Sequence, residues 1–96
     1  MIEIRLVCEN CGKELLTNST EAMICSFECT FCSTCVETIL QNVCPNCGGD
    51  FEKRPIRPKE KLLKYPSSSE RLVKPLDKDK FEFLLLKNKD IKPSER

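Results

Sequence analysis

The 96-residue sequence contains no histidine, so no side chain of ordinary pKa is available as a general base near neutral pH. It also lacks a phosphate-binding loop, a Gly-x-Ser-x-Gly nucleophile turn and a dinucleotide-binding fingerprint. These absences argue against direct catalysis. We therefore expect a protein that is not an enzyme.

Long apolar segments are missing as well. No stretch approaches the length of a membrane span, and the first seven residues lack the apolar core and cleavage site of a secretory signal, since Glu3 and Arg5 interrupt them. We expect a cytoplasmic protein with no membrane partner. In a reducing compartment, closely paired cysteines are more often metal ligands than disulfides.

The cysteines are confined to the first half, and the second half has none. Their spacing, C-x2-C-x13-C-x3-C-x2-C-x2-C-x8-C-x2-C, forms four close pairs. Four thiolates complete the tetrahedral shell of one zinc ion and leave no position for an activated water. We predict two Zn2+ ions per chain, held by Cys8, Cys11, Cys25, Cys29, Cys32, Cys35, Cys44 and Cys47.

The cysteine-bearing part, about residues 1–51, needs such a cross-link. A chain of this size rarely buries enough apolar surface to offset the entropy lost on folding. Two of its cysteine pairs, Cys8-x2-Cys11 and Cys44-x2-Cys47, are followed by Gly12 and Gly48, as in zinc knuckles, where glycine supplies a left-handed backbone conformation. The sequence therefore predicts a metal-stabilised module.

The segments between the cysteines predict a small α+β fold. Alternating apolar and charged residues predict a strand over residues 2–6, and residues 23–32 predict extended structure or a hairpin whose Phe27 and Phe31 cover the sites. Thr34 and Glu37 form a capping-box pattern. They predict a helix that ends near residue 42, with an apolar stripe of Val36, Ile39 and Leu40.

A helix that begins at a cysteine pair, after a knuckle and a hairpin, is typical of a treble-clef zinc fold. The chemical alternative is redox. The run Cys25-x3-Cys29-x2-Cys32-x2-Cys35 is similar to an iron–sulfur motif, but its spacing is reversed from the ferredoxin order and Val36 replaces the usual proline. A second redox alternative is a thiol switch, in which oxidation of the thiolates ejects the metal and unfolds the module.

The ligand order resembles that of a RING finger over residues 8–47, with Cys29 where RING fingers commonly have histidine. The resemblance implies cross-braced ligation. Cys8, Cys11, Cys32 and Cys35 would bind one ion, and Cys25, Cys29, Cys44 and Cys47 the other. The spacing by itself leaves open a sequential pairing, with the first four cysteines on one ion and the last four on the other.

RING fingers imply ubiquitin-ligase activity, but the chain departs from them at two of three relevant positions. Asn10 stands where an apolar residue usually precedes the second ligand, and Gly48 where a basic residue often follows the last ligand. Ile39 lies near the place of the groove aromatic. Because fold analogy alone carries no activity, ligase-like function is only an alternative.

A closer resemblance covers about residues 1–58. The segments Ile24–Cys32 and Cys44–Gly49, with the Arg-Pro-x-Arg-Pro run at residues 54–58, are similar to a family of small bacterial proteins of unknown function. This resemblance supports the fold. It implies no activity.

Residues 52–96 form a basic extension. They carry 14 basic and 8 acidic side chains, against 2 basic and 7 acidic in residues 1–51. Residues 53–58 predict a stiff, extended exit, and residues 77–88 predict either a helix or a strand that docks on the zinc module or on a second copy. We expect an interaction module that docks a protein. Nucleic-acid contact through the basic extension is an alternative, as is a homo-oligomer.

Overall fold

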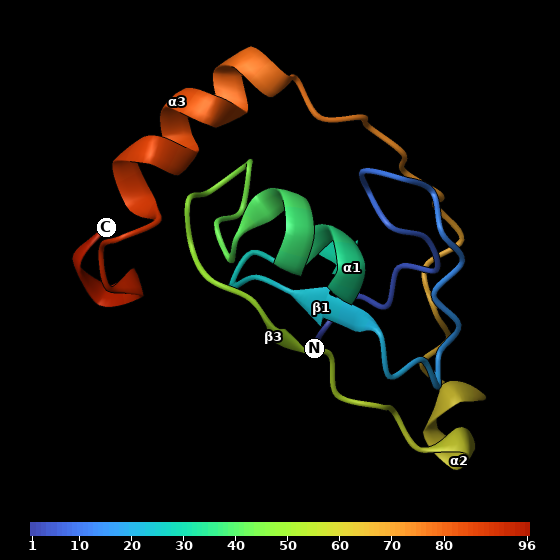
Figure 1. The fold of residues 1–96 in the computed structure, drawn as a ribbon. Helices are drawn as coiled ribbons and strands as arrows, with labels where there is room; N and C mark the ends of the chain where they lie inside the picture. The colour runs from blue at the N-terminus through green and yellow to red at the C-terminus, as the bar shows by residue number, and fades with distance from the viewer.

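A computed structural model describes residues 1–96 as a small α+β fold (Figure 1). Three short strands form one sheet, and a helical segment follows its second strand. The elements are β1 (Ala22–Ile24), β2 (Thr30–Cys32), α1 (Ser33–Cys35), η1 (Val36–Leu40), β3 (Glu52–Lys53), α2 (Lys59–Leu62), α3 (Lys78–Asn88) and η2 (Pro93–Glu95).

The predicted hairpin is confirmed. β1 and β2 are antiparallel with Met23 opposite Phe31, and β3 pairs with the other edge of β1, so that the strand order is β2-β1-β3. β3 lies beyond residue 51, the expected limit of the cysteine module. Phe31 is buried against Phe51 with its ring edge-on, but Phe27 is 74% exposed at the hairpin tip, so the prediction that Phe27 covers a site is wrong.

The predicted helix is present but begins and ends earlier than expected. Cys32, not Thr34, caps it, because the Cys32 sulfur already lies at the helix start and accepts the Cys35 N–H at 3.5 Å. The second part, η1, is a π-helical turn that ends at Leu40, where Gln41 takes a left-handed conformation. Of the predicted stripe, Val36 and Leu40 are buried and Ile39 is exposed.

The predicted strand at residues 2–6 is absent. At its end, Leu6 accepts the Leu15 N–H at 2.7 Å, beside the single antiparallel bridge of Val7 and Glu14. The carbonyls before Leu6 accept hydrogen bonds from the later chain instead of from a neighbouring strand. The side chains of Arg57 and Arg54 donate to the carbonyls of Ile2 and Arg5, each at 2.6 Å, and the Ser68 N–H donates to Ile4 at 2.8 Å. The N-terminal segment is therefore held in place by residues that follow β3.

Arg54 is the largest fully buried side chain, at 1% exposure. Its guanidinium donates to the carbonyls of Arg5 (2.6 Å), Leu16 (2.9 Å) and Leu15 (3.4 Å), and burial lowers its pKa. Arg54 thus joins the N-terminal segment to the loop after the first knuckle. The Arg-Pro run is a structural clamp, and Arg54 is not accessible to the phosphates of a nucleic acid.

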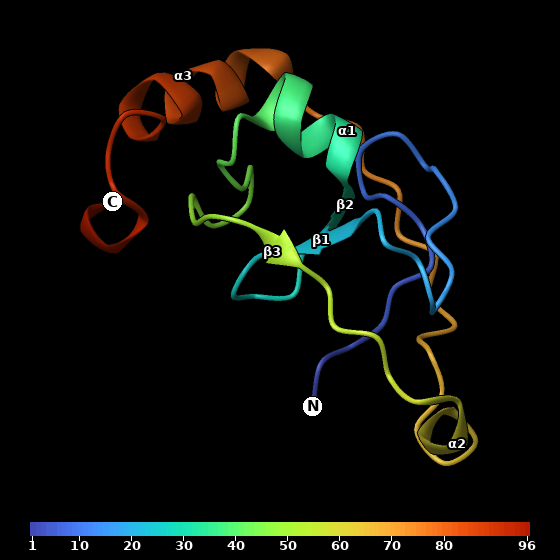
Figure 2. The same cartoon turned by 60° about the horizontal axis from the view of Figure 1, so that its bottom comes forward.

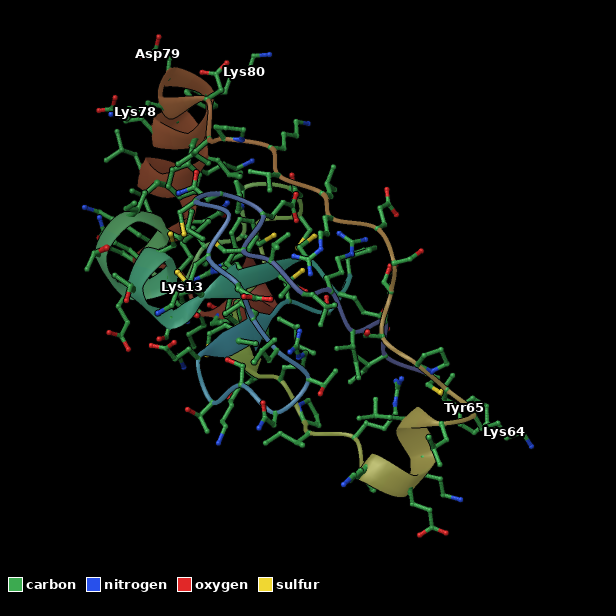
Figure 3. The ribbon with its side chains drawn as sticks, turned by 90° about the vertical axis from the view of Figure 1, so that its right-hand side faces the viewer. Lys13, Lys64, Tyr65, Lys78, Asp79 and Lys80 are labelled. Atoms are coloured by element: carbon green, nitrogen blue, oxygen red, sulfur yellow. The ribbon has the colours of Figure 1, made fainter.

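The extension forms a helix, not a strand, at residues 78–88, because the Asp77 carboxylate caps it by accepting the Lys80 N–H at 3.3 Å. α3 lies across the loop that follows η1 (Figure 2). Its first-turn residues Lys78, Asp79 and Lys80 lie at one end of the molecule, away from Lys64 and Tyr65 beside α2 (Figure 3). No helix has the length and apolar composition that crossing a membrane requires.

Replacing Arg54 tests the clamp. We expect Arg54→Ala to lower the free energy of unfolding by about 3 to 5 kcal/mol, because it leaves a cavity and removes the donor to one buried and two partly buried carbonyls. Arg71→Ala is the matched control, since exposed Arg71 makes only a 3.9 Å ion pair with exposed Glu14; its effect should stay within about 0.5 kcal/mol. Urea unfolding of the metal-loaded protein measures both. Equal stabilities of the two variants would contradict the clamp.

Candidate metal centres

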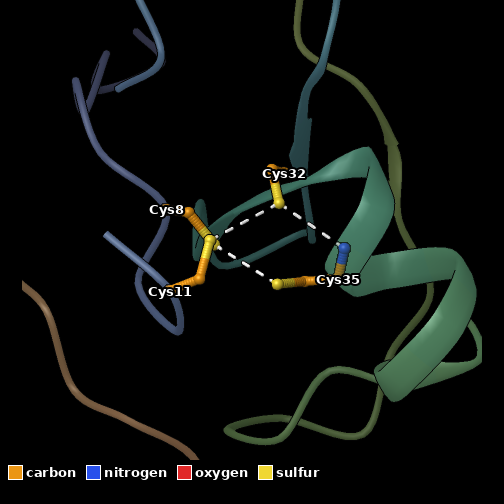
Figure 4. Close-up of side chains that lie close together, drawn as sticks. All are labelled: Cys8, Cys11, Cys32 and Cys35. Carbon is orange, nitrogen blue, oxygen red and sulfur yellow. Dashed lines mark hydrogen bonds between the residues drawn. The ribbon is translucent and has the colours of Figure 1, made fainter. Parts of the chain in front are cut away.

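The first centre brings together the sulfurs of Cys8, Cys11, Cys32 and Cys35, all within 4.8 Å of one another (Figure 4). Two come from the first knuckle, one from the end of β2 and one from α1. The Cys8 and Cys35 sulfurs are 3.9 Å apart, and those of Cys11 and Cys32 are 3.8 Å apart. A tetrahedral ion with metal–sulfur bonds of about 2.3 Å has sulfur–sulfur edges of about 3.8 Å. The cluster therefore fits one tetrahedral ion.

The second centre brings together the sulfurs of Cys25, Cys44 and Cys47 within 4.8 Å of one another. Cys29 lies outside this group but near it, since the thiols of Cys25 and Cys44 both influence its pKa, which burial raises. The hairpin tip closes tightly, since the Cys25 N–H donates to the Cys29 carbonyl at 3.2 Å. The centre therefore consists of three clustered thiols and one adjacent thiol.

The two knuckles have the same backbone geometry. Cys8 N–H donates to the Lys13 carbonyl at 2.8 Å and Gly12 N–H returns to the Cys8 carbonyl at 2.9 Å; in the second knuckle, Cys44 and Gly48 repeat this pattern with two bonds of 2.8 Å. Gly12 and Gly48 have φ of 76° and 78°. The predicted left-handed glycines are thus present, and any side chain at these φ values would be strained.

The clusters are crossed along the chain, so the sequential pairing is wrong. The first and third cysteine pairs meet in one centre, and the second and fourth in the other. The strand β2 is the reason. Cys29 directly precedes it and Cys32 is its last residue, so the two lie about 10 Å apart at the usual strand rise and cannot hold the same ion. The run from Cys25 to Cys35, whose spacing is similar to an iron–sulfur motif, is divided between the two centres.

The surroundings of the thiols differ. Burial raises the pKa of Cys8, but N–H donors from the backbone of Cys11, Cys32 and Asn10 outweigh it, and the net pKa is lowered. Burial raises the pKa of Cys35 to about 12 and also raises the pKa of Cys44. Repulsion from the negative charge on neighbouring thiols adds to the effect of burial on both. A bound dication reverses this repulsion, and coordination to such an ion is what deprotonates buried thiols.

Two asparagines in the knuckles contact the cysteines of the other segments. Asn10 donates from Nδ2 to the Cys35 sulfur at 3.5 Å, and its Oδ1 accepts the Leu76 N–H at 3.0 Å. The amide of Asn46, in the second knuckle, lowers the pKa of the Cys29 thiol, but burial has the larger effect and the net pKa is raised. Sequence analysis missed this role of both residues; the signal is an amide side chain just before the second cysteine of each knuckle.

The two knuckles are joined directly. Asn46 Nδ2 donates to Oε1 of Glu9, a buried residue of the first knuckle, at 3.0 Å. The other carboxylate oxygen lies 3.8 Å from Arg5 Nη1 and has no hydrogen-bond partner. Glu9 was not among the predicted site residues. Through Asn46, it connects the first knuckle to the second knuckle, which carries Cys44 and Cys47.

A sequence model of a family described as a protein of unknown function, DUF1272, matches residues 1–57. The chain belongs to the DUF1272 family. An uncharacterized protein of Rhizobium meliloti (strain 1021) is 52% identical over 75 residues, which is 78% of this chain and 89% of that protein. No solved structure matches the chain.

The family membership confirms the resemblance inferred from the cysteine pattern. The DUF1272 match contains all eight cysteines, the linking residues Glu9 and Asn46, and the clamp residues Arg54 and Arg57. It ends before α2 and α3. The two centres and the clamp thus fall inside the DUF1272 region, and the helical extension falls outside it.

Asn46→Ala tests the link between the knuckles. We expect it to weaken zinc binding at the centre of Cys25, Cys29, Cys44 and Cys47 by about 10 to 100-fold, the usual effect of losing a side chain that orients a metal ligand. Competition with a chromophoric chelator measures this affinity. Asn18→Ala is the control, since Asn18 is an exposed asparagine of the loop after the first knuckle. If the two variants bind zinc equally, Asn46 does not orient the second centre.

Proposed function

We propose that the chain is a RING-like interaction module in which two structural zinc ions hold together a surface that docks another protein. The observation that carries this proposal is the crossing of eight thiols into two clusters, with sulfur–sulfur distances of 3.8 and 3.9 Å in the first. These distances match the edges of one tetrahedral zinc–thiolate site.

The donor set favours zinc over the other common ions. All eight candidate ligands are soft thiols, which suit zinc and copper(I) better than magnesium, calcium or manganese. Zinc has a filled d shell and therefore accepts a tetrahedral arrangement without a geometric preference of its own. The free thiols fit a reducing compartment, and we place the protein in the cytoplasm on that basis.

A structural role for the metal is supported by the closed shell. The first centre supplies four protein sulfurs, three of which are buried, so an ion held there would have no position for substrate or water. No histidine is present anywhere to act as a base. We therefore propose a non-enzymatic protein.

The contacts of the extension also favour a role other than ubiquitin transfer. Asn10 and Gly48 stand at positions where RING ligases usually have an apolar residue and often a basic residue, respectively. The Asn10 side chain is bonded to Cys35 and Leu76, and a Cβ on Gly48 would lie 3.3 Å from the Asn88 amide of α3. Both positions are thus in contact with the chain's own extension.

Metal content tests the proposed function. We expect native mass spectrometry of protein purified without chelator to show two zinc ions per chain, and Cys11→Ser and Cys47→Ser to show one each, since each removes a ligand of a different centre. Ser26→Ala is the control and should retain two, because Ser26 is exposed between Cys25 and Phe27 and carries no thiol.

Removal of zinc by a chelator should abolish the dispersed NMR spectrum of the folded module, because binding energy at structural zinc sites is folding energy. A dispersed spectrum in fully demetallated protein would contradict the structural role. Iron with sulfide in the purified protein would contradict zinc.

A further inference from the structure

One aromatic side chain joins the extension to the zinc module. Phe81 of α3 is only 6% exposed and belongs to the same core cluster as Phe31 and Phe51. Leu84 and Leu85, three and four residues later, pack against this cluster, whereas Phe83 is 78% exposed. α3 therefore docks through one face with a single aromatic anchor.

Phe81 does not completely fill its seat, the site on the module formed by Phe31, Pro45 and Asn46. A cavity of about 260 Å³ lies beside Phe81, between β2 and the second knuckle on one side and the extension on the other. The module contributes Glu9, Phe31, Pro45 and Asn46 to its walls. This cavity is partly open to solvent, so α3 and the segment before it cover this surface only in part.

The connection between the module and α3 is held weakly. None of residues 55–80 is buried. Between Pro66 and Asp77, the hydrogen bonds to the module are those from the N–H groups of Ser68 to Ile4, Lys74 to Glu9 and Leu76 to the Asn10 side chain. Segments with few buried contacts open at a small fraction of the free energy of global unfolding. After α3, Arg96 Nη1 adds two hydrogen bonds of 3.0 Å, to the carbonyls of Asn42 and Gly48. These contacts are few and none is fully buried, so α3 can leave its seat while the module stays folded.

The seat lies within the region matched by the family model, whereas α3, which occupies it, lies outside that region. The DUF1272 match includes the seat residues Phe31, Pro45 and Asn46, but ends at residue 57, before the anchor Phe81. The module is acidic, with 2 basic against 7 acidic side chains in residues 1–51, and Lys74 and Lys80 border the cavity beside buried Glu9. The surface thus suits an apolar anchor accompanied by a cation.

We propose that the surface between β2 and the second knuckle is a docking groove for an amphipathic helix with an aromatic anchor and adjacent lysines, and that α3 occupies this groove in cis. The pattern of Phe81, Leu84 and Leu85 is the i, i+3, i+4 spacing by which helices bind apolar grooves. This proposal rests on the proposed function and adds to it the chemistry of the docked partner. A partner helix would bind by displacing α3.

A labelled peptide of residues 74–92 tests the groove by fluorescence anisotropy against the full chain. Wild type should bind it weakly, because α3 competes from within the same molecule. Phe81→Ala should bind it at least about 10-fold more tightly, since the seat is then open. Phe83→Ala, the matched control on the exposed face, should behave as wild type. A peptide carrying the same Phe81→Ala change should not bind.

The zinc content of each variant separates this proposal from the previous one. If Phe81→Ala retains two zinc ions and a dispersed spectrum but does not bind the peptide, the groove is wrong and the zinc module stands. Leu85→Ala is a milder change that replaces Phe81→Ala if the latter fails to fold. It should increase the affinity for the peptide by a smaller factor. No increase in affinity would overturn the groove. Concentration-dependent dimers of wild type that Phe81→Ala abolishes would support it, since they report exchange of α3 between copies.

Discussion

The crossing of the two cysteine sets is the constraint on which the rest of the fold depends. Cys29, just before β2, and Cys32, its last residue, belong to different centres, so this strand spans the distance between the centres. Five of the thirteen residues in the core cluster are cysteines. The candidate ligands are therefore also the core, and removing one would disturb the packing of apolar side chains as well as a metal site.

Little regular structure surrounds this core. Of 41 backbone hydrogen bonds, 24 lie in turns, loops and caps. An irregular backbone must satisfy its polar groups by other means, and here side chains do so. The buried side chain of Arg54 donates to three carbonyls, Asn46 and Glu9 join the knuckles, and Asn10 links Cys35 to the extension.

The features that could be predicted from the sequence are those with local causes. Gly12 and Gly48 mark the knuckles because the turns require positive φ, and alternation in residues 23–32 indicates a hairpin. Long-range contacts account for the errors. The N-terminal segment has the pattern of a strand, yet its partners are Arg54, Arg57 and Ser68, more than 45 residues away. Thr34 has the pattern of a cap, but the sulfur of Cys32 already occupies that position.

The same distinction applies to the centres. All eight cysteines could be assigned as candidate ligands from spacing, but their division between two clusters depends on the extended conformation of β2, which separates Cys29 from Cys32. Glu9 and Asn46 gave no signal as a pair because they lie 37 residues apart and meet only when both knuckles have formed. The sequence places the anchor Phe81 in an apolar segment, but the site on the module where Phe81 packs could not be predicted from the sequence.

X-ray absorption at the zinc edge tests the central claim most directly, because it reports the ligands of both ions at once. The crossed arrangement predicts four sulfur neighbours per zinc at about 2.3 Å and no shell of oxygen or nitrogen. An average of fewer than four sulfurs, with light-atom neighbours at about 2.0 to 2.1 Å, would show that Cys29 or another thiol does not ligate. That result would contradict two closed four-thiolate centres.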